Sequence, residues 1–153
     1  MSLDNPQRMD RPQIEAQIPH RPPMLLIDEV VEKNERRIVC RKTFQPEEFF
    51  FQGHYPDYPL VPGVILCEAS MQAGAILLAG LAGDGIPVAT RMNDVRFRKM
   101  VRPGDTIRIE VELVERVANA FFMKGKVTRD GQSVMRFEFA CTVAPPQRDR
   151  DAS

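Results

Sequence analysis

The chain has 153 residues, and its 21 lysines and arginines balance its 21 aspartates and glutamates. This length fits one domain with a core of its own, so we expect a single domain over 1–153, with loosely ordered tails at about 1–12 and 144–153. A net charge of zero provides no general attraction for nucleic acid, and we expect no nucleic-acid partner.

The N-terminal stretch and the cysteines indicate the compartment. The stretch MSLDNPQRMDRPQ has no apolar segment behind a positive charge, so it does not resemble a signal peptide and we expect a cytoplasmic protein. Cys40, Cys67 and Cys141 lie far apart within apolar segments, in neither a metal-ligand spacing nor an even disulfide framework. The pattern predicts reduced thiols in the core.

Three elements are predicted in the first half of the chain. Two strands, 24–31 (MLLIDEVV) and 37–44 (RIVCRKTF), are separated by a polar turn. A long helix follows over 62–81, because Pro62 suits a first helical position and several glycines after residue 79 supply stop signals.

The predicted helix is apolar nearly all round, which indicates burial on most of its faces. Its length of about 20 residues also meets the criterion for crossing a membrane. Its polar residues and many small residues instead suit a helix held closely by a sheet: Glu68, Ala69, Ser70, Gln72, Ala73, Gly74, Ala75 and Ala79. We therefore expect no membrane span.

The second half is predicted to be an antiparallel meander. In 105–117 apolar residues alternate with charged ones, the period-two pattern of a half-buried strand. Segments 121–128 and 133–143 flank Arg129-Asp130-Gly131-Gln132, and an Asp-Gly pair between such segments is a hairpin signal. We therefore predict an α+β fold, an antiparallel sheet wrapped around one long buried helix, whose free edge pairs with a second copy.

Three groups near the helix start can act together on a carbonyl compound. Glu68 lies in the apolar segment, where desolvation raises the pKa of a carboxyl group and prepares it to donate a proton. The amide of Gly63 is an early free donor at the positive end of the helix, where it can polarise a carbonyl oxygen. With His54 as base, the set predicts removal of a proton alpha to a carbonyl while a leaving group such as water is protonated. Taken singly, Glu68 is equally well a structural buried acid, and His54 a turn residue.

These residues belong to a longer pattern. The run GHYPDYPLVPGVILCEASMQAG resembles the signature of the (3R)-hydroxyacyl-[acyl carrier protein] dehydratases of type II fatty acid synthesis, the FabZ type of the hotdog superfamily. Upstream, IPHRPPMLLIDEV is similar to that family's Pro-His-Arg block, and NDVRFRKMVRPGDTIRIEVEL to its Arg-Phe-Arg and Pro-Gly-Asp block. The resemblance implies a hotdog fold whose paired subunits build each active site at their interface. It also implies a trimer of dimers, and no metal or redox cofactor.

The resemblance implies a role for each matched position. His54 falls on the catalytic histidine, Glu68 on the catalytic glutamate contributed by the opposite subunit, and Gly63 on the glycine whose amide holds the thioester carbonyl. The implied reaction is the reversible dehydration of a (3R)-hydroxyacyl thioester on acyl carrier protein to the trans-2-enoyl thioester. His54 would take the C2 proton, and Glu68 would assist departure of the C3 hydroxyl, directly or through an ordered water. We predict Gly63, Val64 and Gln72 as substrate-binding residues.

Departures from the family pattern leave the acyl chain length open. The family usually has phenylalanine where Tyr55 stands and often glycine where Asp57 stands. Related dehydratase-isomerases carry aspartate where Glu68 stands, so simple dehydration is favoured. Two other functions remain: a hotdog thioesterase in which Glu68 activates water, and an acyl-binding subunit without turnover.

Two further features are open to more than one interpretation. His20, in the Pro-His-Arg block, is predicted to be a structural loop residue. A basic cluster fits an acidic carrier protein, the phosphate of its pantetheine arm or a solvated strand end. It consists of Arg96, Arg98, Lys99 and Arg102.

Overall fold

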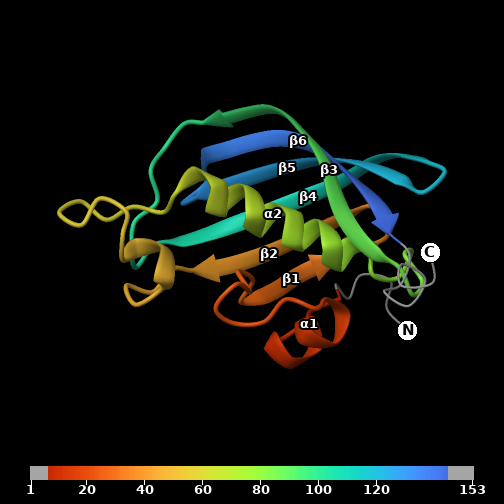
Figure 1. The fold of residues 1–153 in the computed structure, drawn as a ribbon, viewed down its shortest axis with the longest axis horizontal. Helices are drawn as coiled ribbons and strands as arrows, with labels where there is room; N and C mark the ends of the chain where they lie inside the picture. The colour runs from red at the N-terminus through yellow and green to blue at the C-terminus, as the bar shows by residue number, and fades with distance from the viewer. Residues whose placement is uncertain (1–6, 145–153) are drawn as a thin grey trace, which may run out of the picture.

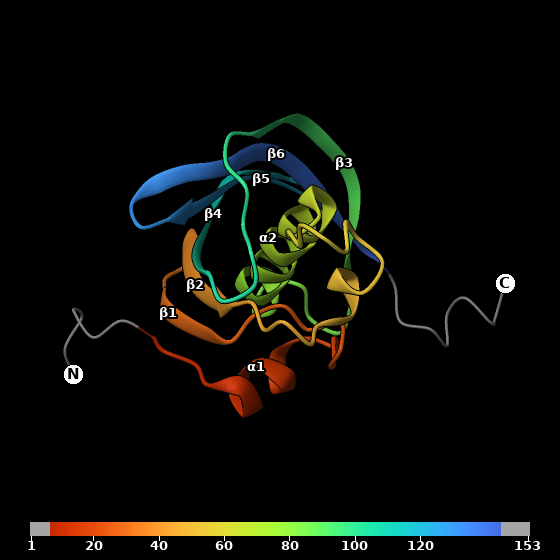
Figure 2. The same cartoon turned by 90° about the vertical axis from the view of Figure 1, so that its left-hand side faces the viewer.

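The computed structural model describes residues 7–144, which form one curved antiparallel sheet around a central helix (Figures 1 and 2). In chain order the elements are α1 (Arg11–Gln17), β1 (Glu29–Lys33), β2 (Arg37–Thr43), the 3-10 turn η1 (Phe49–Phe51), α2 (Gly63–Leu78), β3 (Ile86–Phe97), β4 (Thr106–Val117), β5 (Ala120–Arg129) and β6 (Gln132–Ala144). The strands follow the order β1-β2-β4-β5-β6-β3. The predicted α+β hotdog architecture is confirmed.

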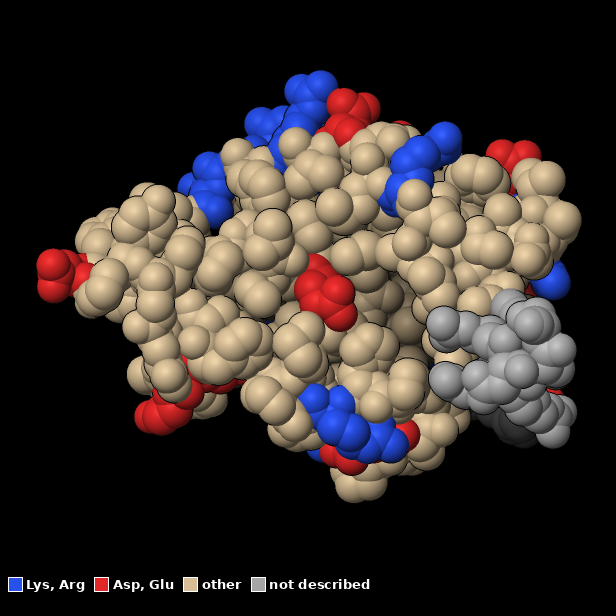
Figure 3. Space-filling model, in the orientation of Figure 1, with Lys and Arg blue, Asp and Glu red and all other residues tan. Residues whose placement is uncertain are grey.

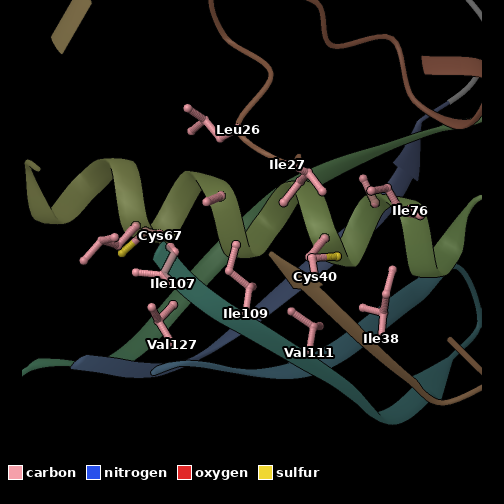
Figure 4. Close-up of a cluster of buried hydrophobic side chains, with 14 of the residues drawn as sticks. Leu26, Ile27, Ile38, Cys40, Cys67, Ile76, Ile107, Ile109, Val111 and Val127 are labelled. Atoms are coloured by element: carbon pink, nitrogen blue, oxygen red, sulfur yellow. The ribbon is translucent and has the colours of Figure 1, made fainter. Parts of the chain in front are cut away.

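The core lies between the inner face of the sheet and α2 (Figure 4). In β4, Ile107 and Ile109 are fully buried while the intervening Arg108 faces outward, as the period-two pattern predicts. Twelve of the 16 residues of α2 are buried. Small residues permit this close approach: a Cβ atom on Gly74 would lie 3.1 Å from the ring of Phe139.

The meander of the second half is confirmed, since β4, β5 and β6 are consecutive neighbours in the sheet. The predicted hairpin turn joins β5 to β6. Asp130 has φ 52° and Gly131 has φ 78°. Two successive residues with positive φ match the right-handed twist of the flanking strands, which is why Asp-Gly suits this turn.

The first predicted strand begins five residues too early. Residues 24–28 are not part of a strand, and β1 starts at Glu29. The reason is that Gln72 binds this segment through both of its polar atoms. Leu26 N–H donates to Gln72 Oε1 at 2.8 Å, and Gln72 Nε2 donates to Met24 O at 2.7 Å. Leu25, Leu26 and Ile27 of this segment are buried, so hydropathy alone indicated a strand.

The N-terminal region is more ordered than predicted. Residues 1–6 and 145–153 lie outside the described residues, but the expectation of loose order is wrong for 9–12. Met9 exchanges two backbone hydrogen bonds with Val30, at 3.1 and 3.0 Å. Asp10 then begins α1 with a capping box, in which its side chain accepts from Gln13 N–H and its own N–H donates to the Gln13 side chain.

No element was predicted over 86–97, where the structure has the 12-residue edge strand β3. Its side chains are exposed at most positions on both faces, so it shows no alternation that marks a strand. Several of the exposed side chains are apolar: Ile86, Val88, Met92 and Phe97. Within the described residues, β3 pairs with β6 alone and leaves its other edge open.

The central helix is slightly shorter than predicted. Pro62 precedes the first helical residue, with extended backbone angles of φ −58° and ψ 138°, and α2 ends at Leu78. A single turn then continues to Ala82, whose N–H donates to Leu78 O. Over the described part of the chain, no helix combines the length and the hydropathy required to cross a membrane.

Candidate active site

Four residues of α2 are not buried: Gly63, Val64, Glu68 and Met71. The last three are spaced by four and three positions. Such spacing places them on one helical face. We call these three residues the α2 stripe. Figure 3 shows the face on which α2 lies, with one acidic group near its centre among uncharged residues.

Gly63 begins α2 against the ring of Phe97 at the end of β3. A Cβ atom at this position would lie 2.7 Å from two atoms of that ring, so the close approach requires glycine. Among the hydrogen bonds of residues 7–144, none uses the Gly63 N–H as a donor. The first N–H groups of a helix have no intrahelical acceptor and lie at its positive end. Gly63 therefore presents a donor suited to a carbonyl oxygen.

His54 lies in the loop between η1 and α2. Its Nδ1 atom is 3.0 Å from the carbonyl oxygen of Leu60. Because a carbonyl can only accept, Nδ1 donates, and in the neutral ring Nε2 then carries the lone pair. The ring of Tyr55 packs edge-on against the imidazole, with centroids 4.6 Å apart. Tyr55 itself adopts φ 51°, so the chain turns sharply directly after the histidine. In this arrangement Nε2 is the ring nitrogen able to accept a proton.

Glu68 lies on α2, one to two helical turns after Gly63. Its side chain is 30% exposed, so the burial expected from the apolar sequence around it is not provided by this chain alone. Gln72, one turn later, donates from Nε2 to Glu68 Oε2 at 2.9 Å. His20 Nε2 lies 3.8 Å from the same carboxylate oxygen. The carboxylate is therefore oriented from one side and open on the other.

Gln72 connects the acid to the buried interior. It is 1% exposed, and both of its polar atoms bind the 24–26 segment while Nε2 also reaches Glu68. The two amide hydrogens are therefore used within the chain. Val64, by contrast, is 70% exposed and lies on the same helical face as Glu68.

A family model described as the FabA-like domain matches residues 18–138. The chain belongs to the FabA-like family.

Relatives within this family agree along most of the chain. The 3-hydroxyacyl-[acyl-carrier-protein] dehydratase FabZ of Petrotoga mobilis is 43% identical over 116 residues, which cover 75% of this chain and 84% of that protein. The FabZ dehydratase of Syntrophobacter fumaroxidans is 37% identical over 147 residues, 94% of this chain and 100% of that protein. The resemblance to FabZ-type proteins seen in the sequence is confirmed.

A solved structure supports the fold of the FabA-like chain. The dehydratase heterocomplex ApeI:P of Xenorhabdus doucetiae contains a chain that matches with a TM-score of 0.77 at 16% sequence identity. The match covers 91% of this chain and 95% of that one. At this identity the likeness concerns the fold alone.

The cysteines of this FabA-like chain are buried and unpaired, as predicted. Burial raises the pKa of the Cys40 thiol to about 12 and that of Cys141 to about 11. Burial also raises the pKa of Cys67, which precedes Glu68 on α2. Because only the thiolate is a strong nucleophile, these thiols are packing groups.

The structure thus brings Val64 and Glu68 to one side of α2, places Gly63 at the first residue of this helix, and places His54 in the loop that leads into it. Two contributors were not recognised from the sequence: the ring of Phe97 behind Gly63, and the bond from Gln72 to Glu68. The spacing of four residues between Glu68 and Gln72 was the available signal, because residues so spaced are neighbours on a helix.

Proposed function

We propose that this chain dehydrates (3R)-hydroxyacyl thioesters on acyl carrier protein to trans-2-enoyl thioesters in fatty acid biosynthesis. The observation that carries the proposal is its identity of 36–43% to FabZ dehydratases. The free Gly63 donor, the His54 base and the oriented Glu68 carboxyl group, in its protonated form, supply the groups that such a reaction needs. No metal or redox cofactor takes part in the proposed chemistry.

In the proposed mechanism, the substrate's thioester carbonyl accepts a hydrogen bond from the Gly63 N–H. This bond stabilises the negative charge that develops on the oxygen when the C2 proton is removed. The positive end of α2 adds to the effect. Val64, exposed next to Gly63, contacts the substrate beside the thioester.

His54 removes the C2 proton through Nε2. The hydrogen bond from Nδ1 to Leu60 O keeps the lone pair on Nε2 and orients the ring. The C2–H bond breaks, and its electron pair forms the double bond between C2 and C3. The carbonyl oxygen bears the developing charge until the C3–O bond breaks.

Glu68 supplies the proton with which the C3 hydroxyl leaves as water. Gln72 fixes the carboxyl group on its buried side, so the open side faces the substrate. After the reaction His54 has gained one proton and Glu68 has lost one, and a transfer between them restores the starting state. Run in reverse, the same steps add water to the enoyl thioester.

We further propose that a second copy completes each site. The long edge strand β3 exposes a free edge and apolar side chains, which suits pairing with a second β3. The α2 stripe is uncovered in one chain, and a partner that covers it would exclude water from Glu68. His54 and Glu68 of one site would come from opposite subunits, and three such dimers would form a hexamer.

The proposed partner outside the oligomer is acyl carrier protein, which delivers the substrate. The proposed location is the cytoplasm, because three buried, unpaired cysteines suit a reducing compartment.

The test is to mix the purified protein with a trans-2-enoyl thioester and to follow its ultraviolet band, with mass analysis of the products. Loss of the enoyl band together with a gain of one water is the expected result. Release of a free thiol would instead identify a thioesterase, and tight binding of unchanged substrate would identify an acyl-binding subunit. Either of these two outcomes would refute the proposed function.

A further inference from the structure

Two loops meet at the end of the molecule where α2 begins (Figure 1). We call residues 52–61 the His54 loop and residues 98–105, between β3 and β4, the anchor loop. The two are joined by a backbone hydrogen bond from Val61 N–H to Val101 O, at 2.7 Å. They are also joined by a side-chain contact, in which the guanidinium carbon of Arg102 lies 4.4 Å from the centre of the Tyr58 ring.

The anchor loop is held firmly to the sheet. Arg129 on β5 donates through Nη1 to Met100 O at 2.6 Å and to Asp105 Oδ2 at 2.9 Å. The same Asp105 oxygen accepts the N–H of Arg102 at 2.8 Å. The backbone that carries the Arg102 side chain is therefore fixed.

The His54 loop is closed mainly on itself. The Nδ1 atom of His54 binds Leu60 O, and Tyr58 N–H donates to Tyr55 O at 2.8 Å. Within the described residues, the Arg102 contact is the one hydrogen bond, ion pair or aromatic contact that ties residues 53–60 to a distant segment. It acts at Tyr58, inside the span that the bond between His54 and Leu60 closes.

We propose that the Arg102–Tyr58 contact positions His54. This inference rests on the proposed function, in which His54 is the base. The cation over the ring face holds the closed span 54–60 against the anchor loop. The contact thereby sets the direction of His54 Nε2 toward the substrate, although Arg102 touches neither the histidine nor the substrate. Tyr58 and Arg102 are positioning residues.

The geometry indicates the size of the effect. Tyr58 is 48% exposed, so the contact is partly hydrated. Exposed cation–π contacts correspond to a change of about two- to fivefold in an equilibrium or a rate. An unanchored loop would lower the population in which Nε2 is aimed correctly, so kcat would fall while KM changes little.

The test compares hydration of a trans-2-enoyl-N-acetylcysteamine thioester, which has neither a carrier protein nor a phosphate, by the wild type, Tyr58→Ala, Arg102→Ala, the double variant and Tyr58→Phe. Each alanine variant should lose about two- to fivefold in kcat. The kcat of the double variant should be no lower than that of the slower single variant, because both substitutions remove the same contact. Tyr58→Phe should keep the wild-type rate, because its ring keeps the cation–π contact. Arg108→Ala, an exposed arginine on the outer face of β4, is the charge-matched control.

The carrier-free substrate separates positioning from carrier docking, the other interpretation of Arg102. A docking role predicts wild-type rates with this substrate, and that result would overturn the inference. Additive losses in the double variant would overturn it as well.

Hydrogen exchange at amides 54–60 provides a readout independent of turnover. Exchange should be faster in Tyr58→Ala and Arg102→Ala at an unchanged melting temperature, and unchanged exchange would refute the contact's role. Faster exchange in the two variants, combined with a wild type that shows no hydratase activity, would retain the loop anchor and refute the proposed function.

Discussion

The two sides of α2 differ in composition and in burial. The side that faces the sheet is made of apolar and small residues in close contact, such as Gly74 against Phe139. The opposite side carries the α2 stripe, where Val64 and Glu68 are left uncovered. Residues on the first side pack the core, and residues on the second are the ones proposed to contact and convert the substrate. Variants on the two sides should therefore separate stability from activity.

The largest effect is expected from the two residues proposed to move protons. His54→Ala and Glu68→Gln should each reduce turnover by about 10²–10⁴-fold, the usual contribution of a positioned acid or base. Their melting temperatures should stay close to that of the wild type, because neither side chain packs in the core. Turnover and thermal unfolding measured on the same samples check both statements. A rate near that of the wild type in either variant would remove that residue from the mechanism.

Substitution of Gln72 should lower both stability and activity, because this side chain is buried and also donates a hydrogen bond to Glu68. Gln72→Leu leaves Leu26 N–H and Met24 O without their partner. The bond to Leu26 is buried, so its loss should cost about 1–3 kcal/mol, whereas the part-buried bond to Met24 should cost less. Activity should fall further than this loss of stability explains, because Glu68 loses its orienting bond.

A matched control exists on the same helix. Ser70 is also buried, but its hydroxyl binds only Leu66 O of its own helix. Ser70→Ala should cost about 1 kcal/mol or less in the free energy of unfolding and leave the rate unchanged. Denaturant unfolding and kinetics on both variants provide the measurement. Equal effects of the two substitutions would show that Gln72 is only a packing residue.

Gly63→Ala should have a smaller effect. Its new Cβ would lie 2.7 Å from the Phe97 ring, which must move aside. Overpacking typically costs about 1–3 kcal/mol, and the low end is expected because the ring is half exposed. Activity should also fall, because the shifted helix start displaces the N–H donor. Gly63→Ala combined with Phe97→Leu should recover the stability, and failure to do so would show that the ring contact is not the cause.

The smallest effect is expected in the core, and it concerns the reactivity of a buried cysteine thiol. Burial raises the pKa of Cys40 to about 12, so below that pH the folded chain holds it almost wholly as the unreactive thiol. Iodoacetamide at pH 8 should leave Cys40 unmodified in the native protein and modify it in urea. Mass analysis of digested peptides checks this, and rapid labelling without denaturant would contradict the packing.

The elements that could be predicted from the sequence are those with a local signal. Alternation identified β4, and Asp130-Gly131 identified the turn between β5 and β6. The strand β3 could not be identified, because its side chains are exposed at most positions on both faces, so the sequence carries no alternation there. The segment 24–28 was mistaken for a strand because its backbone binds Gln72, a residue 46 positions from Leu26. Helix α1 was missed although its capping residues, Asp10 and Gln13, can be seen in the sequence.

The same distinction applies to the candidate site. His54, Gly63 and Glu68 could be named because they lie in one continuous run that resembles a known family. The contacts that orient them come from distant segments: Phe97 behind Gly63, and Arg102 against Tyr58. No local pattern encodes such contacts, so they required the fold.

Mixing two inactive variants would test most directly whether each site is built between two copies. His54→Ala and Glu68→Gln chains are combined, allowed to exchange subunits, and assayed with a trans-2-enoyl thioester. A mixed dimer has one site with both residues intact only if the two residues come from opposite subunits. Complete random exchange should then restore about a quarter of the wild-type activity, since half of the dimers are mixed and each has one intact site. Activity no higher than that of the separate variants, once mass analysis has confirmed mixed dimers, would contradict a shared site.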